Sequence, residues 1–202
     1  IDGINRELKA GAEQLHRASW LLVTFGTAYV YSLRETGKVV ANCHKLPASL
    51  FDRRRVGVDE MIRGWIPLIE RLSDSNPELR IMFTVSPIRH LRDGAHENQL
   101  SKSVLLLFVD ELCRLYPDRC IYFPSYEIVM DELRDYRFYD AGMTHPNEQA
   151  IRYIWERFSE ACFSEETRTL NREWERLEKA LNHRPLTPDK DAFRDFTMQN
   201  LF

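Results

Sequence analysis

The sequence lacks long apolar runs, an abundance of glycine and an excess of charge of either sign. No apolar stretch approaches the ~20 residues that a membrane-spanning helix needs. Only eight of the 202 residues are glycine, and 44% are apolar, which excludes both a low-complexity chain and wholesale disorder. Because 28 Lys and Arg face 31 Asp and Glu, no general attraction to nucleic acid or acidic lipid is expected. These absences predict a soluble globular protein.

Cofactor and metal motifs are also missing. The sequence contains no P-loop, no GxGxxG and no metal-ligand spacing, so it predicts neither a cofactor nor a metal site. Its four cysteines (Cys43, Cys113, Cys120 and Cys162) are widely spaced and form no CxxC pair. We therefore expect reduced, structural thiols and a cytoplasmic location. A secreted or periplasmic location stays open, because the chain opens at Ile1 and not at a methionine.

Alternating strand and helix patterns predict an α/β fold. Nearly continuous apolar runs at 20–25, 80–85 and 120–123 are typical of parallel strands covered on both faces. Between them, apolar stripes at helical spacing predict helices over 58–72 and 101–116. Strand, helix, strand, helix, strand is the order of a parallel βαβ sheet.

Helices are also predicted at both ends of the chain. One precedes the first strand, with Ile4 and Leu8 on its apolar stripe, and another begins at Pro146. A last helix is expected to start after Ser164 as its N-cap. Its predicted buried positions are Leu170, Trp174, Leu177 and Leu181. We expect a single domain over 1–202, with 164–202 as a C-terminal helical extension.

Small polar and basic side chains follow the predicted strands. Ligands of open α/β sheets bind beyond the carboxyl ends of the strands. The first strand is followed by Gly26-Thr27-Ala28 and the second by 86–90. His145 lies just before Pro146, in the N-cap region of a predicted helix, where the positive helix end favours a neutral imidazole. Such a histidine suits a general base, and the alternative is that it only caps the helix.

Other basic residues leave alternatives open. His90 beside Arg89 binds an anionic or carbonyl group, or simply holds its loop. Asn98 is most simply interpreted as a loop residue that precedes the helix at 101. The run Arg53-Arg54-Arg55 is interpreted as a solvated face, with phosphate binding as the less favoured alternative.

Seven segments of the chain together carry a resemblance to one known family. They are 24–31 (TFGTAYVY), 42–47 (NCHKLP), 83–90 (FTVSPIRH), 97–102 (ENQLSK), 123–128 (FPSYEI), 133–139 (LRDYRFY) and 145–147 (HPN). The family that they resemble is GSCFA. The resemblance covers the chain from Trp20 to Phe158. GSCFA proteins are similar to the SGNH, or GDSL-like, hydrolases. This implies a flavodoxin-like, three-layer α/β/α sandwich with a Ser-His-Asp site.

The resemblance implies roles for individual residues. His145 corresponds to the base that deprotonates the nucleophile and protonates the leaving group. A backbone N–H at Gly26 or Thr27 corresponds to an oxyanion donor. Ser86, Arg89 and His90 are expected to line the pocket. SGNH enzymes carry an Asp three residues before the histidine; here that position is Gly142, and Asp140 is the displaced candidate for the acid.

Two further departures leave two hypotheses. The Gly-Ser-Cys-Phe-Ala motif with its nucleophile is absent from these residues and is expected upstream of Ile1, and Ala28 replaces the usual Asn of its block. The first hypothesis is a serine hydrolase, or an acyltransferase, acting on an ester of a carbohydrate or lipid. The alternative is a non-catalytic member that binds a small molecule. No nucleic-acid partner is expected, and the sequence does not predict an oligomeric state.

Overall fold

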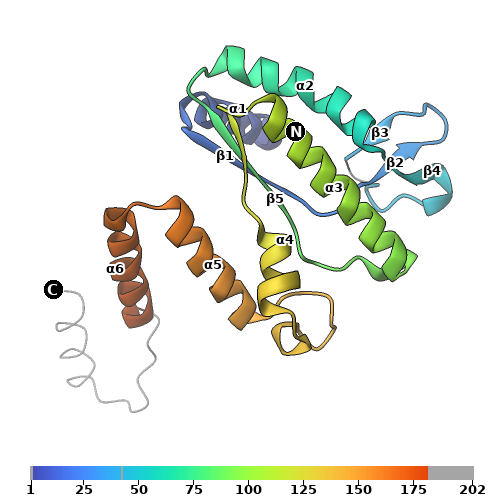
Figure 1. Cartoon of the computed structure of the whole chain (residues 1–202). Coiled ribbons are helices and arrows are strands. Elements are labelled where there is room, and N and C mark those ends of the chain that lie inside the picture. The colour runs from blue at the N-terminus through green and yellow to red at the C-terminus, as the bar shows by residue number, and fades with distance from the viewer. Residues whose placement is uncertain (1, 42, 182–202) are drawn as a thin grey trace. The chain divides into compact units, whose positions relative to one another are not determined.

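The computed structural model describes residues 2–41 and 43–181, which divide between two compact units, Ile1–Ile151 and Arg152–Phe202 (Figure 1). The strands are β1 (Trp20–Phe25), β2 (Tyr29–Leu33), β3 (Val39–Val40), β4 (Phe51–Arg55), β5 (Arg80–Val85) and β6 (Cys120–Tyr122). The α-helices are α1 (Asp2–Arg17), α2 (Val58–Ser75), α3 (Ala95–Leu115), α4 (Ser125–Glu127), α5 (Glu148–Cys162) and α6 (Glu165–Leu181). Shorter turns are η1 (Ala48–Leu50), η2 (Leu91–Asp93), the π-helical η3 (Ile128–Leu133) and η4 (Tyr136–Phe138).

The predicted parallel sheet is confirmed. Its strand order is β1-β5-β6, and both pairs of neighbouring strands are parallel. The bounds of β1 and β5 match the prediction, whereas β6 ends at Tyr122, one residue early. In the register of β1 on β5, Val23 lies opposite Phe83 and Phe25 opposite Val85. The carboxyl ends of β1 and β5 therefore lie side by side.

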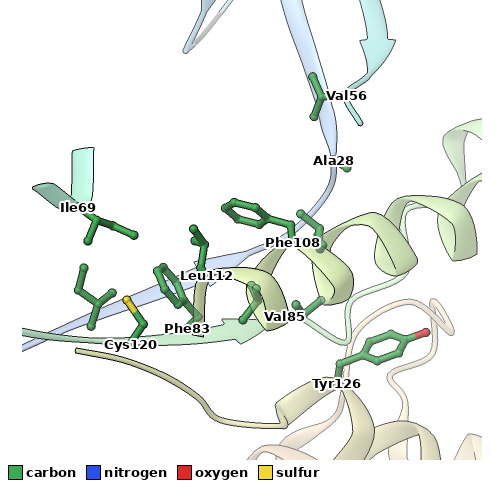
Figure 2. Close-up of a cluster of buried hydrophobic side chains, with 12 residues drawn as sticks. Ala28, Val56, Ile69, Phe83, Val85, Phe108, Leu112, Cys120 and Tyr126 are labelled. Atoms are coloured by element: carbon green, nitrogen blue, oxygen red, sulfur yellow. The ribbon is translucent and has the colours of Figure 1, made fainter. Parts of the chain in front are cut away.

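One face of this sheet carries the core. The rings of Phe25 on β1, Trp65 on α2, Phe83 on β5 and Phe108 on α3 pack with centroids 5.2–6.0 Å apart. Phe83 and Phe108 are fully buried in the cluster drawn in Figure 2. Both connecting helices thus cover the same face, because consecutive crossovers that advance in one direction place their helices on one side.

On the opposite face, the two outer strands are partly exposed in the described part of the first unit, whereas Met82 on the central strand is buried. Trp20, Leu22 and Ile121 are 40%, 56% and 39% exposed. The expected sandwich has three layers, whereas the sheet and the pair α2 and α3 form two. The coarser prediction, a mixed α/β fold with C-terminal helices, is confirmed.

A second, antiparallel sheet was not predicted. Its order is β3-β2-β4, and β4 includes the arginine run that was interpreted as a solvated face. Arg53 pairs with Asp93 on η2 (2.6 Å), and Arg55 pairs with Glu97 on α3 (2.8 Å). The run is therefore an ion-paired strand that fastens the small sheet to the start of α3.

Helix α3 begins six residues earlier than predicted, at Ala95. Asn98 is consequently helical and not part of a loop. Its side-chain oxygen accepts a hydrogen bond from the backbone N–H of His90 (2.9 Å). The polar residues of this first helical turn carry no apolar stripe, so the periodicity detected only the later part of the helix.

The second unit contains most of α5 and all of α6. Ser164 caps α6 as predicted, because its Oγ accepts the N–H of Thr167 (3.2 Å). The expectation that Leu170 and Trp174 are buried was wrong: they are 59% and 66% exposed. A pair of helices has too little apolar surface to enclose both. The remaining part of the predicted extension, 182–202, lies outside the described residues.

All four cysteines are unpaired thiols. Within the residues that the structure describes, no helix combines the length and the apolar character needed to cross a membrane.

Candidate functional site

The turn after β1 and the segment after β5 are joined at the edge of the sheet. The N–H of Ser86 donates to the carbonyl of Phe25 (2.9 Å), so the two segments are still hydrogen-bonded to each other where the strands end. His90 lies against the first turn, since its Nε2 is 3.6 Å from the position that a Cβ would take on Gly26. Gly26, Ser86 and His90 are thus brought together as the sequence predicted for one sheet edge.

Buried hydrogen bonds hold the turn after β1. Ser101 on α3 is 2% exposed, and its Oγ accepts the N–H of Ala28 (2.7 Å). The same Oγ lies 3.1 Å from the Oγ1 of Thr27. The backbone of this turn is therefore clamped by the side chain of a helix that belongs to the core.

Lys102, the next residue on α3, was missed as a functional candidate. It is 1% exposed, and its Nζ donates to the carbonyl of Gly26 (2.6 Å) and to the carbonyl of Ser86 (2.5 Å). Burial lowers its pKa to about 8. A signal existed in the sequence, because Lys102 shares a helical face with the apolar Leu105 and Val109, at spacings of three and seven.

Electrostatics favour a neutral His90. Burial is the main cause that lowers the pKa of its imidazole. The positive charge of Lys102 lowers this pKa further, followed by the charges of His145 and Arg53. These effects favour the uncharged form of the ring, and His90 lies within electrostatic range of the second candidate histidine.

His145 lies in an exposed turn closed by a bridge between Tyr139 and Pro146. The N–H of Asp140 donates to the carbonyl of His145 (2.8 Å). The Oδ2 of Asp140 is 3.7 Å from Nδ1 of His145, and the hydroxyl of Thr144 is closer to the same nitrogen, at 2.9 Å. Carboxylate and imidazole thus face each other just beyond hydrogen-bond distance.

Gly142 leaves room for that carboxylate. A Cβ at position 142 would lie 3.4 Å from Oδ1 and 3.7 Å from Oδ2 of Asp140. The Asp140 side chain therefore folds back over the backbone of Gly142. The Asp140 carboxylate therefore lies next to the place where the Cβ of an aspartate at position 142 would be.

The helix-cap interpretation of His145 was wrong. Helix α5 begins at Glu148, and not at Pro146. The Oδ1 of Asn147 accepts the N–H of Ala150 (3.1 Å), so Asn147 caps the helix. Pro146 is held in the bridge to Tyr139, which keeps the chain extended for two residues beyond His145. The positive end of the helix therefore no longer gives a reason to expect a neutral imidazole at His145, because His145 does not cap α5.

Arg89 connects the two halves of the region. Its backbone N–H donates to the carbonyl of Thr144 (3.0 Å), and its guanidinium lies 4.1 Å from the ring centroid of Tyr139. A weak hydrogen bond also joins its Nη1 to the carbonyl of Met143 (3.5 Å). The segment 86–90 thus touches the strand-end turn through Ser86 and His90, and the His145 turn through Arg89.

The nearby serines have structural partners. Ser86 Oγ accepts the N–H of Ile88 (3.3 Å), and the buried Ser125 donates to the carbonyl of Val85 (2.8 Å) while also contacting the hydroxyl of Thr84. None of these bonds, nor those of Ser101, involves a histidine. Across residues 2–41 and 43–181, no three His, Cys, Asp or Glu side chains gather as metal ligands.

Comparison with known proteins gives a family. The family model described as GSCFA family matches residues 1–158, and the model described as GSCFA domain protein, C-terminal domain, matches residues 174–202. Neither the curated proteins nor the solved structures include a significant match. The first match covers well over half of the 202 residues. On this finding, the chain belongs to the GSCFA family.

Proposed function

We propose that this protein is an SGNH-like acyl hydrolase that cleaves an ester of a carbohydrate or lipid through a serine acyl-enzyme. The observation that carries the proposal is the approach of the Asp140 carboxylate to Nδ1 of His145, at 3.7 Å, beside the ends of two parallel strands. Catalytic hydrogen bonds are often long without substrate and tighten in the reacting complex. His145 is then the general base and Asp140 the residue that orients its ring.

The proposed chemistry follows from these roles. A serine hydroxyl attacks the ester carbonyl while Nε2 of His145 takes its proton, and the negative charge collects on the carbonyl oxygen. Collapse of this intermediate breaks the C–O bond, and the imidazolium returns the proton to the leaving alcohol. Water repeats the sequence on the acyl-enzyme and releases the acid.

The nucleophile in this proposal comes from outside the 202 residues. Ser86, Ser101 and Ser125 are bonded to the backbone, and none of them is bonded to a histidine. The Gly-Ser-Cys-Phe-Ala motif, which carries the presumed nucleophile of the family, is not in this sequence. We therefore assign the nucleophile to that motif in the complete natural protein.

In this proposal, the residues around the strand ends contact the substrate. The Thr27 N–H serves the oxyanion, and Gly26 lets substrate approach the backbone closely. His90, Arg89 and Ser86 border the ester group. The neutral ring of His90 donates or accepts a hydrogen bond without adding charge next to the base.

A covalent probe tests the proposal. The complete natural protein is treated with a fluorophosphonate, and the modified residue is mapped by peptide mass spectrometry. We expect a labelled serine in the Gly-Ser-Cys context, with labelling and p-nitrophenyl ester turnover reduced at least ~10³-fold in His145→Ala. The exposed His96, which lies on α3 outside the site, gives the matched control His96→Ala with wild-type rates.

A second function is favoured by the same turn. Asp140 is too far from His145 for a hydrogen bond, Thr144 is closer to the ring nitrogen, and Gly142 and Ala28 replace expected site residues. These features suit a member that has lost hydrolysis and binds a small molecule without cleaving it. A folded complete protein with no label on any serine would favour binding over catalysis.

A further inference from the structure

A buried ammonium without a carboxylate partner lies beneath the strand ends. Lys102 is 1% exposed, and the only cause found for its lowered pKa is burial, so no acidic group in the described part of the chain compensates its charge. Burying an unpaired cation carries a large free-energy cost, and such groups concentrate at functional sites. Its two acceptors are the carbonyls of Gly26 and Ser86, the first residues after β1 and β5.

The bond to Gly26 determines the direction of one backbone amide. The described chain contains no cis peptide bond, so the C=O of Gly26 and the N–H of Thr27 point in opposite directions. With the carbonyl held toward Lys102 and the core, the Thr27 N–H points away from them. No hydrogen bond to this N–H is found among the residues that the structure describes.

The neighbouring amides are not available for the same task. Ser101 Oγ already takes the N–H of Ala28. The second carbonyl that Lys102 holds belongs to Ser86, and the next residue is Pro87, which has no N–H. Of the two peptides that Lys102 holds, only the one between Gly26 and Thr27 offers a donor.

We propose that Lys102 is a positioning residue, which holds the Gly26–Thr27 peptide so that the Thr27 N–H is aimed and polarised as an oxyanion donor. This inference rests on the proposed hydrolase function. Lys102 itself is buried and does not touch substrate; it acts through the peptide. A charged donor on the carbonyl makes the N–H of the same amide a stronger donor, because hydrogen bonds in a chain polarise one another.

The charge of Lys102 therefore matters as well as its hydrogen bonds. The titratable group whose pKa responds to this charge is His90, on the segment after β5. The pKa of its imidazole also responds to His145 and Arg53. None of these groups is acidic. A neutral substitute at position 102 is expected to weaken the donor even where the turn keeps its shape, whereas a cationic substitute retains the effect.

The first experiment measures the coupling without catalysis. In the complete natural protein, the ¹³Cε signal of Lys102 and the amide signal of Thr27 are followed by NMR from pH 6 to 10. We expect both to titrate with one midpoint, near pH 8, and the Thr27 transition to disappear in Lys102→Met and in Lys102→Arg, which stays charged throughout. A Thr27 signal that is independent of pH in the wild type, or that titrates unchanged in Lys102→Met, overturns the inference.

The second experiment measures turnover of a p-nitrophenyl ester at pH 7. Lys102→Met is expected to lower kcat by about 10- to 100-fold, with KM within about twofold, because loss of one oxyanion donor lowers kcat by about 10² or more. Lys102→Arg restores most of the rate. The control Lys38→Met, at an exposed lysine between β2 and β3, keeps wild-type kinetics.

The outcomes separate the two proposals. Wild-type kcat in Lys102→Met, or equal losses in the Met and Arg variants together with a lower melting temperature, overturns the positioning role while the hydrolase stands. Absence of turnover and of fluorophosphonate labelling in the wild type overturns the hydrolase. The NMR titration then decides alone whether Lys102 controls the Thr27 amide.

Discussion

The turn after β1 and the turn that carries His145 hold their polar groups in different ways. At the first, Ser101 and Lys102 are almost fully buried and bond the backbone at 2.5–2.7 Å. At the second, the side chains of His145 and Asp140 are 58% and 44% exposed, and their closest approach is 3.7 Å. One turn is clamped by the core, and the other is held mainly by its own backbone.

This difference matches the tasks that the proposed mechanism assigns to the two turns. Oxyanion donors are effective when they are fixed before the reaction, because they then need no reorganisation as charge develops. A general base must exchange protons with substrate and solvent, and its hydrogen bonds tighten in the reacting complex. We infer a rigid donor side and an adjustable base side. Three predictions test this contrast, from the largest expected effect to the smallest.

The first prediction concerns the pH dependence of stability. Burial lowers the pKa of Lys102 from 10.5 to about 8, so between these values the unfolded chain binds more protons than the folded one. The free energy of unfolding therefore rises with pH across this window, by on the order of 2 kcal/mol from Lys102 alone. The measurement is urea unfolding at pH 7.5 and 10, compared with Lys102→Met.

That comparison is needed because other groups act in the opposite sense. Burial raises the pKa of the Cys120 thiol to about 12, which lowers stability as the unfolded thiol ionises above pH 9. This contribution is common to both proteins and cancels in the difference. An equal pH slope in wild type and Lys102→Met would contradict a desolvated Lys102.

The second prediction concerns the clamp by Ser101. Ser101→Ala leaves the buried N–H of Ala28 without its acceptor, which is expected to lower the free energy of unfolding by about 1–3 kcal/mol. Ser103→Ala is the matched control on the same helix, since its hydroxyl bonds only the carbonyl of Gln99 one turn earlier. A change in Ser101→Ala no larger than in the control would show that the strand-end turn is not clamped.

The third prediction concerns the His145 turn. Thr144→Val removes the hydroxyl that lies 2.9 Å from Nδ1 of His145, at an exposed site. Because water replaces that hydroxyl, we expect a change below about 0.5 kcal/mol in the free energy of unfolding, measured by thermal denaturation. A loss above ~1 kcal/mol would show that this turn, like the turn after β1, depends on its side-chain hydrogen bonds, and the two turns would then not differ.

Strands and helices with a clear apolar pattern were predictable. β1 and β5 have the predicted bounds, and Ser164 caps α6, because buried apolar runs and N-cap residues are local signals. β4 was not predictable, because its charged residues Arg53–Arg55 are typical of a solvated face and become a strand only by pairing with β2 and with distant carboxylates. The polar first turn of α3 was missed for a related reason.

The candidate site divides in the same manner. Gly26, Ser86 and His90 were predicted as site residues because they follow the strands. The structure brings them together because parallel strands end at one edge. Lys102 was overlooked, since lysine is seldom buried, and only the packing of α3 beneath both strand ends gives its ammonium two carbonyls. The approach of Asp140 to His145 depends on a folded turn of six residues, which no periodicity encodes.

By itself, the sequence determined the parallel strands, the helices that connect them, and the edge at which His145, Arg89 and Gly26 would be sought. These properties follow from local patterns of apolar side chains and from the geometry common to all parallel sheets. Only the tertiary structure decided that Lys102 lies under that edge, that Asn147 and not His145 caps α5, and that Asp140 folds over Gly142. Each of these depends on contacts between segments, whose free energy is not a property of either segment alone.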